Sequence, residues 1–424
     1  MRQPQVDRHA ETIRWVQSYA QLMLADDVLT ELAGRLNDQI VAEMREFSAD
    51  AGVRRDLDAS TRDALRSFLS LIARDADSPL VMPPAALDLA RTLAQRRHDV
   101  GVLLRLYRIG QRVLWSELMA IVEREVADPE LRMAILHYLW ERLSKTLEQN
   151  MTALVAAHTE EAERTLRGAL ARKVETVHAL LRGDALEVDR AGQWLGHNLR
   201  RNQTGLVLWA TDDVEDPDPS GKLEMLAGEV AATIGADRPL TVQSSARVVW
   251  AWLAGDPRPD LTRIAEVPLV RCGPGLRVAV GVPARGVAGF RRSHREAVLA
   301  HRVAVNGASD DTVTLYRDVE IVSCLSADTE SMRALVEREL GGLTKDDPAV
   351  ARLRDTVLAY FSGGSSARAA ADALGVHKNT VLYRLRQAEE LLGHGIDERR
   401  LTLELALLLV DAYGTSVLPG PLPS

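Results

Sequence analysis

Two short helices near the C-terminal end of the chain, joined by a glycine turn, constrain the fold more than any other feature. Residues 366–374 favour one helix, which Gly375 ends, and the next helix is expected to begin at His377 or Lys378. Apolar residues of the second helix recur at steps of four, three and four and so share one side: Val381, Leu385, Ala388 and Leu392. With Val376 as the buried residue of the turn, the pattern predicts a helix-turn-helix.

The other side of the second helix is polar and basic. Its candidate DNA-binding residues are His377, Lys378, Asn379, Thr380, Tyr383, Arg384, Arg386 and Gln387. Residues 376–387 include three Lys or Arg residues and no acidic one, although the 424-residue chain carries a net charge of −8. Cations and amides on one helix face bind phosphates and base edges in the major groove. Any one of these residues could be polar simply because it faces solvent. As a set that follows a glycine turn, they predict an interface for double-stranded promoter or operator DNA.

One position departs from the commonest helix-turn-helix pattern, which has an apolar residue nine positions after the turn glycine. That position is Arg384 here, and the next residue, Leu385, takes the buried role, as in a subclass with leucine at the tenth position. We therefore expect Leu385 to be buried, and we expect Asn379 and Arg384 to lie on the solvent face.

Composition limits the class of protein. A chain of 424 residues is long enough for two to four domains. With 52 basic and 60 acidic residues, any nucleic-acid contact must be local. Hydrophobic residues make up 46% and aromatic residues only 4%, so we expect cores of Leu, Ala and Val in a mainly helical fold.

The chain shows no sign of secretion or of membrane insertion. Cys272 and Cys324 are far apart and belong to no motif, which predicts a cytoplasmic location without disulfides. The first residues lack the apolar run of a signal peptide. The most apolar stretch, residues 401–410, is too short to cross a bilayer, so no membrane contact is expected.

Residues 7–158 predict a helical sensory bundle. Apolar residues recur at three- and four-residue steps in segments 11–24, 27–46, 60–74, 85–95, 100–126 and 130–157. Asp27 and Ser60 are candidate N-caps. Residues 159–185 then form a connecting helix, in which an apolar stripe resembles a coiled-coil seam: Leu166, Leu170, Val174, Val177 and Leu181. Two interpretations stay open, namely a dimer-forming connector and a helix packed on its own domain.

Residues 186–320 change pattern and predict a central α/β (α+β) domain. Strands are expected at 204–210, 240–243, 248–253, 276–282 and 312–315, with helices at 222–234 and 287–305. A helix at 329–340 and a linker at 341–348 lead into a helix-turn-helix domain at 345–414, and residues 415–424 are expected to be a disordered tail. The fold class is therefore multidomain and mainly α, with a helical bundle at the N-terminus and a helix-turn-helix at the C-terminus.

The sequence offers no candidate catalytic residues, metal ligands or cofactor-binding residues. Between residues 271 and 300 the single acid is Glu296, whereas a cyclase needs several carboxylates to hold magnesium against a triphosphate. The arginines of this stretch suggest an anionic effector, with solvated surface arginine as the alternative. The glycines at 281, 286 and 289 lack the lysine of a phosphate loop and are expected to serve the strand-to-helix turn. We therefore expect no enzyme activity.

The chain also resembles a known family. The strings Leu374-Gly375-Val376-His377 and Asn379-Thr380-Val381-x-Tyr383-Arg384-Leu385 are similar to the DNA-binding domain of PucR/CdaR-type transcriptional regulators. These include regulators of purine catabolism and of sugar diacids. Residues 94–111 with Trp115 resemble the RsbRD-like helical N-terminal domain of stress co-antagonists. Residues 276–281 and 289–297 resemble the degenerate, GGDEF-like middle domain of the same regulators.

The resemblance implies a transcription regulator that acts near its target promoters, as a homodimer or higher homo-oligomer. In this interpretation the first two domains sense a small-molecule effector or a partner. Two alternatives remain: a stress-signalling scaffold that binds kinase or anti-sigma partners without binding DNA, and a nucleotide-signalling enzyme or receptor.

Overall fold

The computed structural model describes residues 3–47, 49–74, 82–256, 258–267 and 273–419. The chain divides into two compact units, Met1–Ala171 and Arg172–Ser424. Each unit has its own buried cores, and the second unit combines a mixed sheet with the C-terminal helices. The prediction of a multidomain, mainly α protein with a central α/β domain is confirmed.

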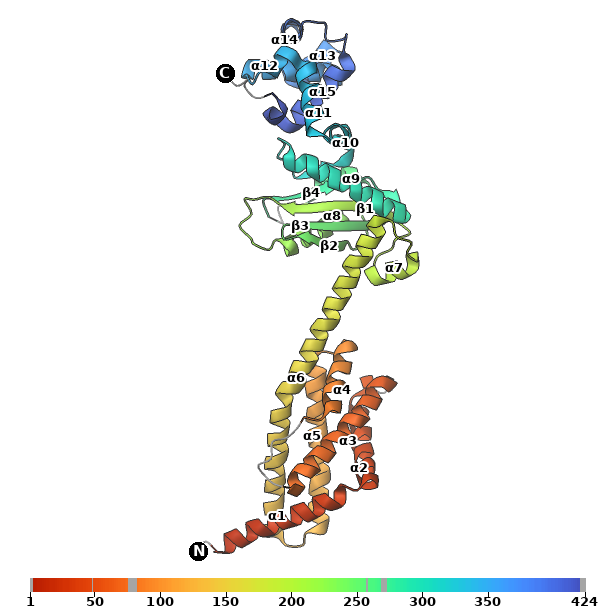
Figure 1. The fold of residues 1–424 in the computed structure, drawn as a ribbon, viewed down its shortest axis with the longest axis vertical. Helices are drawn as coiled ribbons and strands as arrows, with labels where there is room; N and C mark the ends of the chain where they lie inside the picture. The colour runs from red at the N-terminus through yellow and green to blue at the C-terminus, as the bar shows by residue number, and fades with distance from the viewer. Residues whose placement is uncertain (1–2, 48, 75–81, 257, 268–272, 420–424) are drawn as a thin grey trace. The chain divides into compact units, whose positions relative to one another are not determined.

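The N-terminal unit is a helical bundle. Its helices are α1 (Gln3–Met23), α2 (Asp26–Glu43), α3 (Ala51–Arg74), α4 (Pro84–Gln95), α5 (Val100–Glu125) and the first part of α6 (Pro129–Arg182). Two apolar cores fill it, one centred on Phe68 and Ile135 and one on Phe47 and Leu89. Figure 1 shows these helices in red to orange, with α6 in yellow.

The start of α3 differs from the prediction. The Asp50 carboxylate accepts hydrogen bonds from the backbone N–H groups of Gly52 and Val53 at 2.9 and 3.1 Å, so the helix begins nine residues before Ser60. Ser60 is therefore not a cap and is buried in the middle of the helix. Asp27 is not a cap either, because it lies in the first turn of α2 behind Ala25. Of the sequence between the predicted segments 60–74 and 85–95, residues 75–81 lie outside the described residues.

Helix α6 is one element of 54 residues, where two helices meeting near residue 158 were predicted. No proline follows Pro129 before the helix ends at Arg182, and the first glycine is Gly168. Nothing in this part of the sequence interrupts the i to i−4 hydrogen bonds, and so the two predicted segments join.

The sheet of the second unit has the strand order β2-β3-β1-β4-β6, and β5 pairs with β1. The strands are β1 (Asn202–Ala210), β2 (Leu240–Ser245), β3 (Val248–Gly255), β4 (Leu276–Val280), β5 (Ala284–Arg285) and β6 (Val313–Leu315). The central strand β1 is antiparallel to β3, β4 and β5, whereas β4 and β6 are parallel. The five predicted strands are all present, and the two-residue β5 was not predicted.

The sheet is covered on both faces, because successive residues of β1 point to opposite sides. Leu206 and Leu208 pack with α8 (Ser220–Thr233), and Val207 and Trp209 pack with α9 (Gly286–Asn306). Figure 1 shows α9 lying across the sheet. Burial on both faces explains why β1 is a continuous apolar run instead of an alternating one.

Helix α9 approaches the sheet unusually closely. The N–H of Gly205 donates a hydrogen bond to Ser293 Oγ at 2.8 Å. A Cβ atom at Gly281 would lie 1.9 Å from the carbonyl oxygen of Ser293, so no larger residue fits there. Gly281 lies in the turn that follows β4, as expected, and the structure adds a packing role against α9 that the sequence did not predict.

The C-terminal helices form one core. They are α10 (Tyr316–Leu325), α11 (Thr329–Leu340), α12 (Pro348–Ser362), α13 (Ala367–Leu374), α14 (Lys378–Leu392) and α15 (Arg400–Tyr413). Buried residues of α15 contribute to the centre of this core: Leu403, Ala406, Leu407 and Leu409. Two short helices of this unit, α7 (Val188–Leu195) and α10, were not predicted.

The segment 341–348 is not a free linker. Leu343 is fully buried, and the Arg354 guanidinium donates hydrogen bonds to the carbonyl oxygens of Leu343 and Lys345 at 2.7 and 3.1 Å. The described part of the expected tail is also packed, since Val417 and Leu418 are buried in the same core. Residues 420–424 of that tail lie outside the described residues.

Across the described residues, none of the helices is long and apolar enough to cross a membrane. The same part of the chain holds no group of three or more His, Cys, Asp or Glu side chains that could bind a metal ion.

Candidate nucleic-acid interface

The turn between α13 and α14 is built as the sequence predicted. Ser366 caps α13 by accepting a hydrogen bond from the Ala369 N–H at 3.3 Å. Gly375 ends that helix in the left-handed conformation, with φ +63°, which glycine adopts at least cost. The N–H of Val376 then donates to the Ala371 carbonyl at 3.0 Å, and Val376 packs half-buried against the core.

The inner side of α14 is held by its neighbours. Val381, Leu385 and Ala388 are buried, and Leu392 is half-buried against the same core. Leu385 therefore takes the buried role that was expected of the tenth position. Gly393 ends the helix with φ +79°.

The outer side of α14 keeps most of the candidate side chains accessible. Five are exposed: His377, Lys378, Asn379, Tyr383 and Arg386. Three are half-buried: Thr380, Arg384 and Gln387. The structure thus brings all eight onto the start and outer face of one helix, where a groove of DNA can approach them.

Arg384 corrects the prediction, because it does not lie on the solvent face. Its guanidinium is 3.4 Å from the hydroxyl oxygen of Thr356 on α12, a long contact that draws the side chain toward its own domain. Thr356 is itself buried and donates to the Arg352 carbonyl at 2.6 Å. Arg384 therefore joins α14 to α12 as well as standing at the edge of the outer face.

His377 is the N-cap of the helix. Its Nδ1 atom accepts a hydrogen bond from the Asn379 N–H at 3.2 Å, so the ring is held in place by the backbone that it caps. A helix N-terminus favours phosphate, because its first N–H groups point outward. His377 and Lys378 stand at that end.

Tyr383 and Gln387 form a pair one turn apart. Gln387 Nε2 donates a hydrogen bond to Tyr383 Oη at 3.1 Å, and the tyrosine side chain is 62% exposed. The residue that sequence reasoning missed is Leu382, an apolar side chain that is 41% exposed beside them. The sequence did contain a sign of this exposure, because Leu382 is apolar but does not belong to the buried stripe that begins at Val381. An exposed leucine there can contact a thymine methyl group.

Glu296, the single acid between residues 271 and 300, stabilises the fold of the middle domain. Glu296 is buried, and its carboxylate accepts hydrogen bonds from the Val282 N–H at 2.9 Å and from Arg292 Nε at 2.7 Å. These bonds tie the end of the sheet to α9. The carboxylate is therefore already bonded within the domain.

The arginines between residues 271 and 300 differ in their surroundings, and Arg285 among them is exposed. Arg277 is paired with Asp310 at 3.2 Å. Arg291, Arg292 and Arg295 line a surface hollow of about 610 Å³ on α9. Arg271 lies outside the described residues. An anionic effector for this domain stays a prediction.

The apolar stripe of α6 is exposed along part of its length. Leu166, Leu170 and Val174 are 61%, 52% and 37% exposed. Val177 is fully buried with Trp252 and Phe290, and Leu181 packs half-buried against them. Packing on the middle domain therefore explains the end of the stripe but not its first three residues.

Comparison with known proteins identifies three consecutive domains. The family models that match are the RsbT co-antagonist protein rsbRD N-terminal domain at residues 30–173, the GGDEF-like domain at 180–303 and the PucR C-terminal helix-turn-helix domain at 353–409. The last of these contains all eight candidate residues of α14.

Two individual proteins are similar to parts of the chain. The transcriptional activator PmfR of Paenarthrobacter nicotinovorans is 23% identical over 269 residues, which cover 63% of this chain and 52% of the relative. The chain thus spans about half the length of this curated relative. The crystal structure of a regulator of polyketide synthase expression from Bifidobacterium adolescentis is 18% identical, with a TM-score of 0.27, and the match covers 57% of this chain and 97% of that one.

Proposed function

We propose that the chain is a DNA-binding transcriptional regulator of the PucR type that acts on promoter or operator DNA, and the match of residues 353–409 to the PucR C-terminal helix-turn-helix domain supports this proposal. The single observation that carries the proposal is the outer face of α14, where exposed cations and amides stand opposite a buried apolar stripe. Such a regulator acts in the cytoplasm, where its DNA lies.

We assign the contacts by chemistry. Asn379 and Arg386 are the candidates for base edges, because an amide binds adenine bidentately and a guanidinium binds guanine bidentately. His377, Lys378 and Thr380 stand at the helix start and are the candidates for phosphate. Tyr383, with Gln387 bonded to it, is placed for the sugar-phosphate backbone or a thymine methyl group.

A homodimer fits this assignment. One recognition helix makes few base contacts, and two half-sites multiply the specificity. We propose that the exposed part of the α6 stripe, Leu166, Leu170 and Val174, is covered by the same stripe of a second copy. The full stripe recurs at steps of four, four, three and four, which is near the 3.5-residue period of such a seam.

The domains serve separate roles in this proposal: residues 7–158 as sensory bundle, 159–185 as connecting helix, 186–320 as middle domain and 345–414 as DNA-binding domain. One packing detail supports an earlier start of the last domain. Glu339 of α11 is buried and accepts hydrogen bonds from Arg399 and Thr402, both at 2.7 Å, so α11 is bonded to the start of α15.

We propose that the middle domain is a sensory or coupling domain and not an enzyme. Glu296 is the single acid between residues 271 and 300, and its carboxylate is already bonded to the Val282 N–H and to Arg292 Nε, whereas a magnesium site for a triphosphate needs several carboxylates. Incubation of the full chain with GTP or ATP and magnesium tests this part, and a cyclic or linear nucleotide product would overturn it.

A salt-dependent gel shift tests the proposed function. The probe is a fragment recovered by mapping the genomic DNA that the full chain binds, with a scrambled fragment as competitor. Specific binding is expected to weaken steeply as salt rises, because bound phosphates release counterions. Asn379→Ala should weaken specific binding, whereas Glu390→Ala, which changes an exposed residue farther along α14, should leave it unchanged. Equal affinity for both fragments would overturn the proposal.

The second candidate is a stress-signalling scaffold that binds kinase or anti-sigma partners without DNA. The match of residues 30–173 to the N-terminal domain of a co-antagonist protein favours it. The two candidates are separated by the gel shift, since a scaffold of this kind would not distinguish the mapped fragment from the scrambled one.

A further inference from the structure

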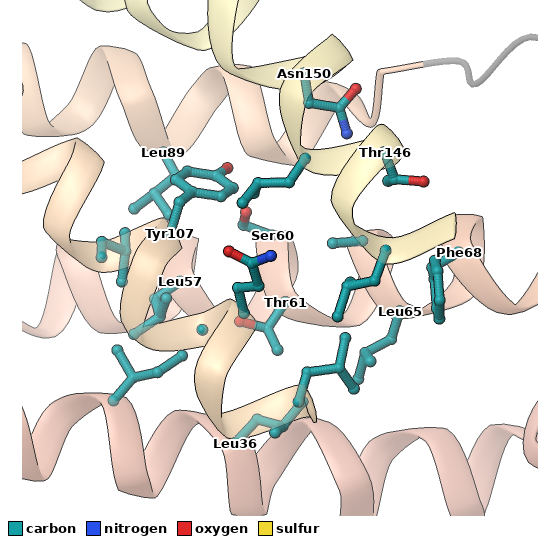
Figure 2. A pocket seen from close by; sticks show the side chains of 18 residues that line it. Leu36, Leu57, Ser60, Thr61, Leu65, Phe68, Leu89, Tyr107, Thr146 and Asn150 are labelled. Atoms are coloured by element: carbon teal, nitrogen blue, oxygen red, sulfur yellow. The ribbon is translucent and has the colours of Figure 1, made fainter. Parts of the chain in front are cut away.

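The N-terminal unit contains a hollow between helices α2, α3, α4, α5 and α6. Its volume is about 130 Å³, and Figure 2 shows the 18 side chains that line it. We call it the bundle pocket. The polar residues of its wall are Ser60, Thr61, Tyr107, Gln111, Thr146 and Asn150. The remaining residues are apolar, and none of the 18 is charged.

The bundle pocket involves residues that the proposed function did not use. Tyr107, Gly110 and Gln111 belong to the segment that carries the resemblance to co-antagonist N-terminal domains, and all three line the wall. Leu36 and Phe68, which the cores of the bundle need, form other parts of it.

One polar atom of the wall lacks a partner. Tyr107 Oη is buried and makes no hydrogen bond to any residue that the structure describes. Burial raises the pKa of Tyr107 to about 12. The nearby Ser60 hydroxyl acts to lower this pKa, but it does not lie in hydrogen-bonding geometry to Tyr107 Oη. The hydroxyl therefore keeps its proton at neutral pH and is available as a donor. Buried polar groups are normally bonded, so an unused donor beside a hollow indicates a missing acceptor.

The other polar side chains of the wall differ in whether they already form hydrogen bonds within the protein. Thr61 Oγ1 already donates to Asn37 Oδ1 at 2.6 Å. Ser60, Tyr107 and Asn150 come from three different helices, α3, α5 and α6, and Figure 2 shows them around the same space. A ligand with one oxygen could reach the Tyr107 hydroxyl while its hydrocarbon part contacts the leucines.

We propose that the bundle pocket binds a small uncharged ring compound of about the size of phenol, whose oxygen accepts a hydrogen bond from Tyr107. The size follows from the volume, because an apolar cavity of roughly 150 Å³ is known to bind benzene. The lack of charge in the ligand follows from the wall, which offers no ion partner to a buried charge.

In the proposed function this ligand is the effector of the regulator. The binding of the ligand does not depend on the proposed function, but its regulatory role does. Thr146, Leu147 and Asn150 of α6 form part of the wall. The same helix continues without a break to Arg182. Occupancy of the pocket therefore acts on the helix that leads out of the bundle.

The test is direct binding to the full chain, measured by calorimetry and by the shift of the melting temperature. Phenol is the polar probe, toluene the apolar probe and benzoate the charged probe. Phenol and toluene are expected to bind saturably and to raise the melting temperature, whereas benzoate should do neither. Tyr107→Phe should weaken phenol by about five- to tenfold, the worth of one hydrogen bond, and leave toluene unchanged.

A filled pocket is the matched control. A Cβ atom at Gly110 would meet only Ile40 Cδ1, at 3.7 Å, so Gly110→Leu has room to fold and places its side chain beside the pocket. Ala64→Leu fills the same space from α3 if the first variant does not fold. Both should abolish phenol and toluene binding.

Three results would overturn the proposal: no saturable binding of phenol or toluene, undiminished binding to a folded filled variant, or equal phenol affinity in Tyr107→Phe. None of these measurements uses DNA, so they test the pocket separately from the DNA-binding function that the gel shift tests. A chain that shifts the mapped fragment but binds neither phenol nor toluene would keep its DNA-binding function and lose this pocket.

Discussion

The guanidinium of Arg384 lies 3.4 Å from the hydroxyl oxygen of Thr356, so a side chain at the edge of the DNA-facing surface also contacts the preceding helix of its own domain. Neighbouring Asn379 has no such contact to α12 and is exposed. The two residues therefore differ in what their removal should do.

Replacing Arg384 should affect both stability and DNA binding. Arg384→Ala removes the contact to Thr356 and is expected to lower the free energy of unfolding by about 1 kcal/mol. Asn379→Ala should leave that free energy within about 0.5 kcal/mol of the wild type and weaken specific binding by about 1–3 kcal/mol. Urea denaturation and gel shifts on the same samples measure both effects. Equal unfolding midpoints for the two variants would contradict the role given to Thr356.

Glu339 should make the C-terminal core sensitive to acid. Burial raises the pKa of this carboxyl, but hydrogen bonds from Thr402 and Arg338 and the charge of Arg399 outweigh it, and the net pKa is lowered. A carboxyl with a lowered pKa in the folded state stabilises the fold above its ordinary pKa of 4.5, and this stabilisation is lost as the pH falls through the folded-state pKa.

The check compares urea midpoints at pH 7 and pH 4. The wild type should lose more stability between these values than Glu339→Gln, whose amide cannot titrate. Glu398→Gln, at an exposed position nearby, serves as the control and should behave like the wild type. The same pH slope in Glu339→Gln and the wild type would show that Glu339 is not the group responsible.

His294 should act in a second and higher pH window. It is buried between Trp250 and Trp252, with ring centroids 4.6 and 4.8 Å away, and burial lowers its pKa to about 4. As the pH falls below 6.5, His294 becomes protonated in the unfolded chain but stays neutral in the folded chain. The free energy of unfolding therefore decreases between pH 6.5 and 4. At pH 4 this loss reaches about 3 kcal/mol.

Unfolding of the full chain at pH 7 and pH 5 measures this effect. His294→Phe should show a shallower fall than the wild type, although the new ring also changes packing at pH 7. The comparison of slopes, not of absolute stabilities, is therefore the readout. An unchanged slope would mean that His294 takes up a proton equally in both states.

The exposed stripe of α6 should control the oligomeric state. Leu170→Lys places a charge in the proposed seam and is expected to convert a dimer into a monomer, since a buried unpaired charge is costly. Ala171→Lys, one residue away and exposed, is the matched control and should remain a dimer. Sedimentation equilibrium distinguishes the two masses, and a wild type that is monomeric at micromolar concentration would refute the seam.

The periodic segments could be predicted from the sequence, whereas the parts that depend on a neighbour could not. Strand β1 and helix α14 were predicted because burial leaves a pattern of apolar residues in the sequence, a continuous run in β1 and steps of three and four in α14. Helix α10 was missed because it is short and contains Val319, Ile321 and Val322, which favour strands; its packing against α9 and the C-terminal core decides its structure.

The same reason explains the corrections at the site. Spacing placed Arg384 on the solvent face, but it could not show that Thr356 lies within reach of its long side chain. Spacing likewise gave no sign that Val417 and Leu418, in a segment rich in Pro and Gly, have a core to enter. Such contacts join residues that are far apart in the sequence.

Arg354 closes the segment before α12 by bonding to the carbonyl oxygens of Leu343 and Lys345. Within the described residues, the segment 341–348 therefore does not act as a flexible tether, and α14 shares one apolar core with α11, α12 and α15. In a pair of such chains, a longer spacer between two operator half-sites would not be accommodated by extension of this segment.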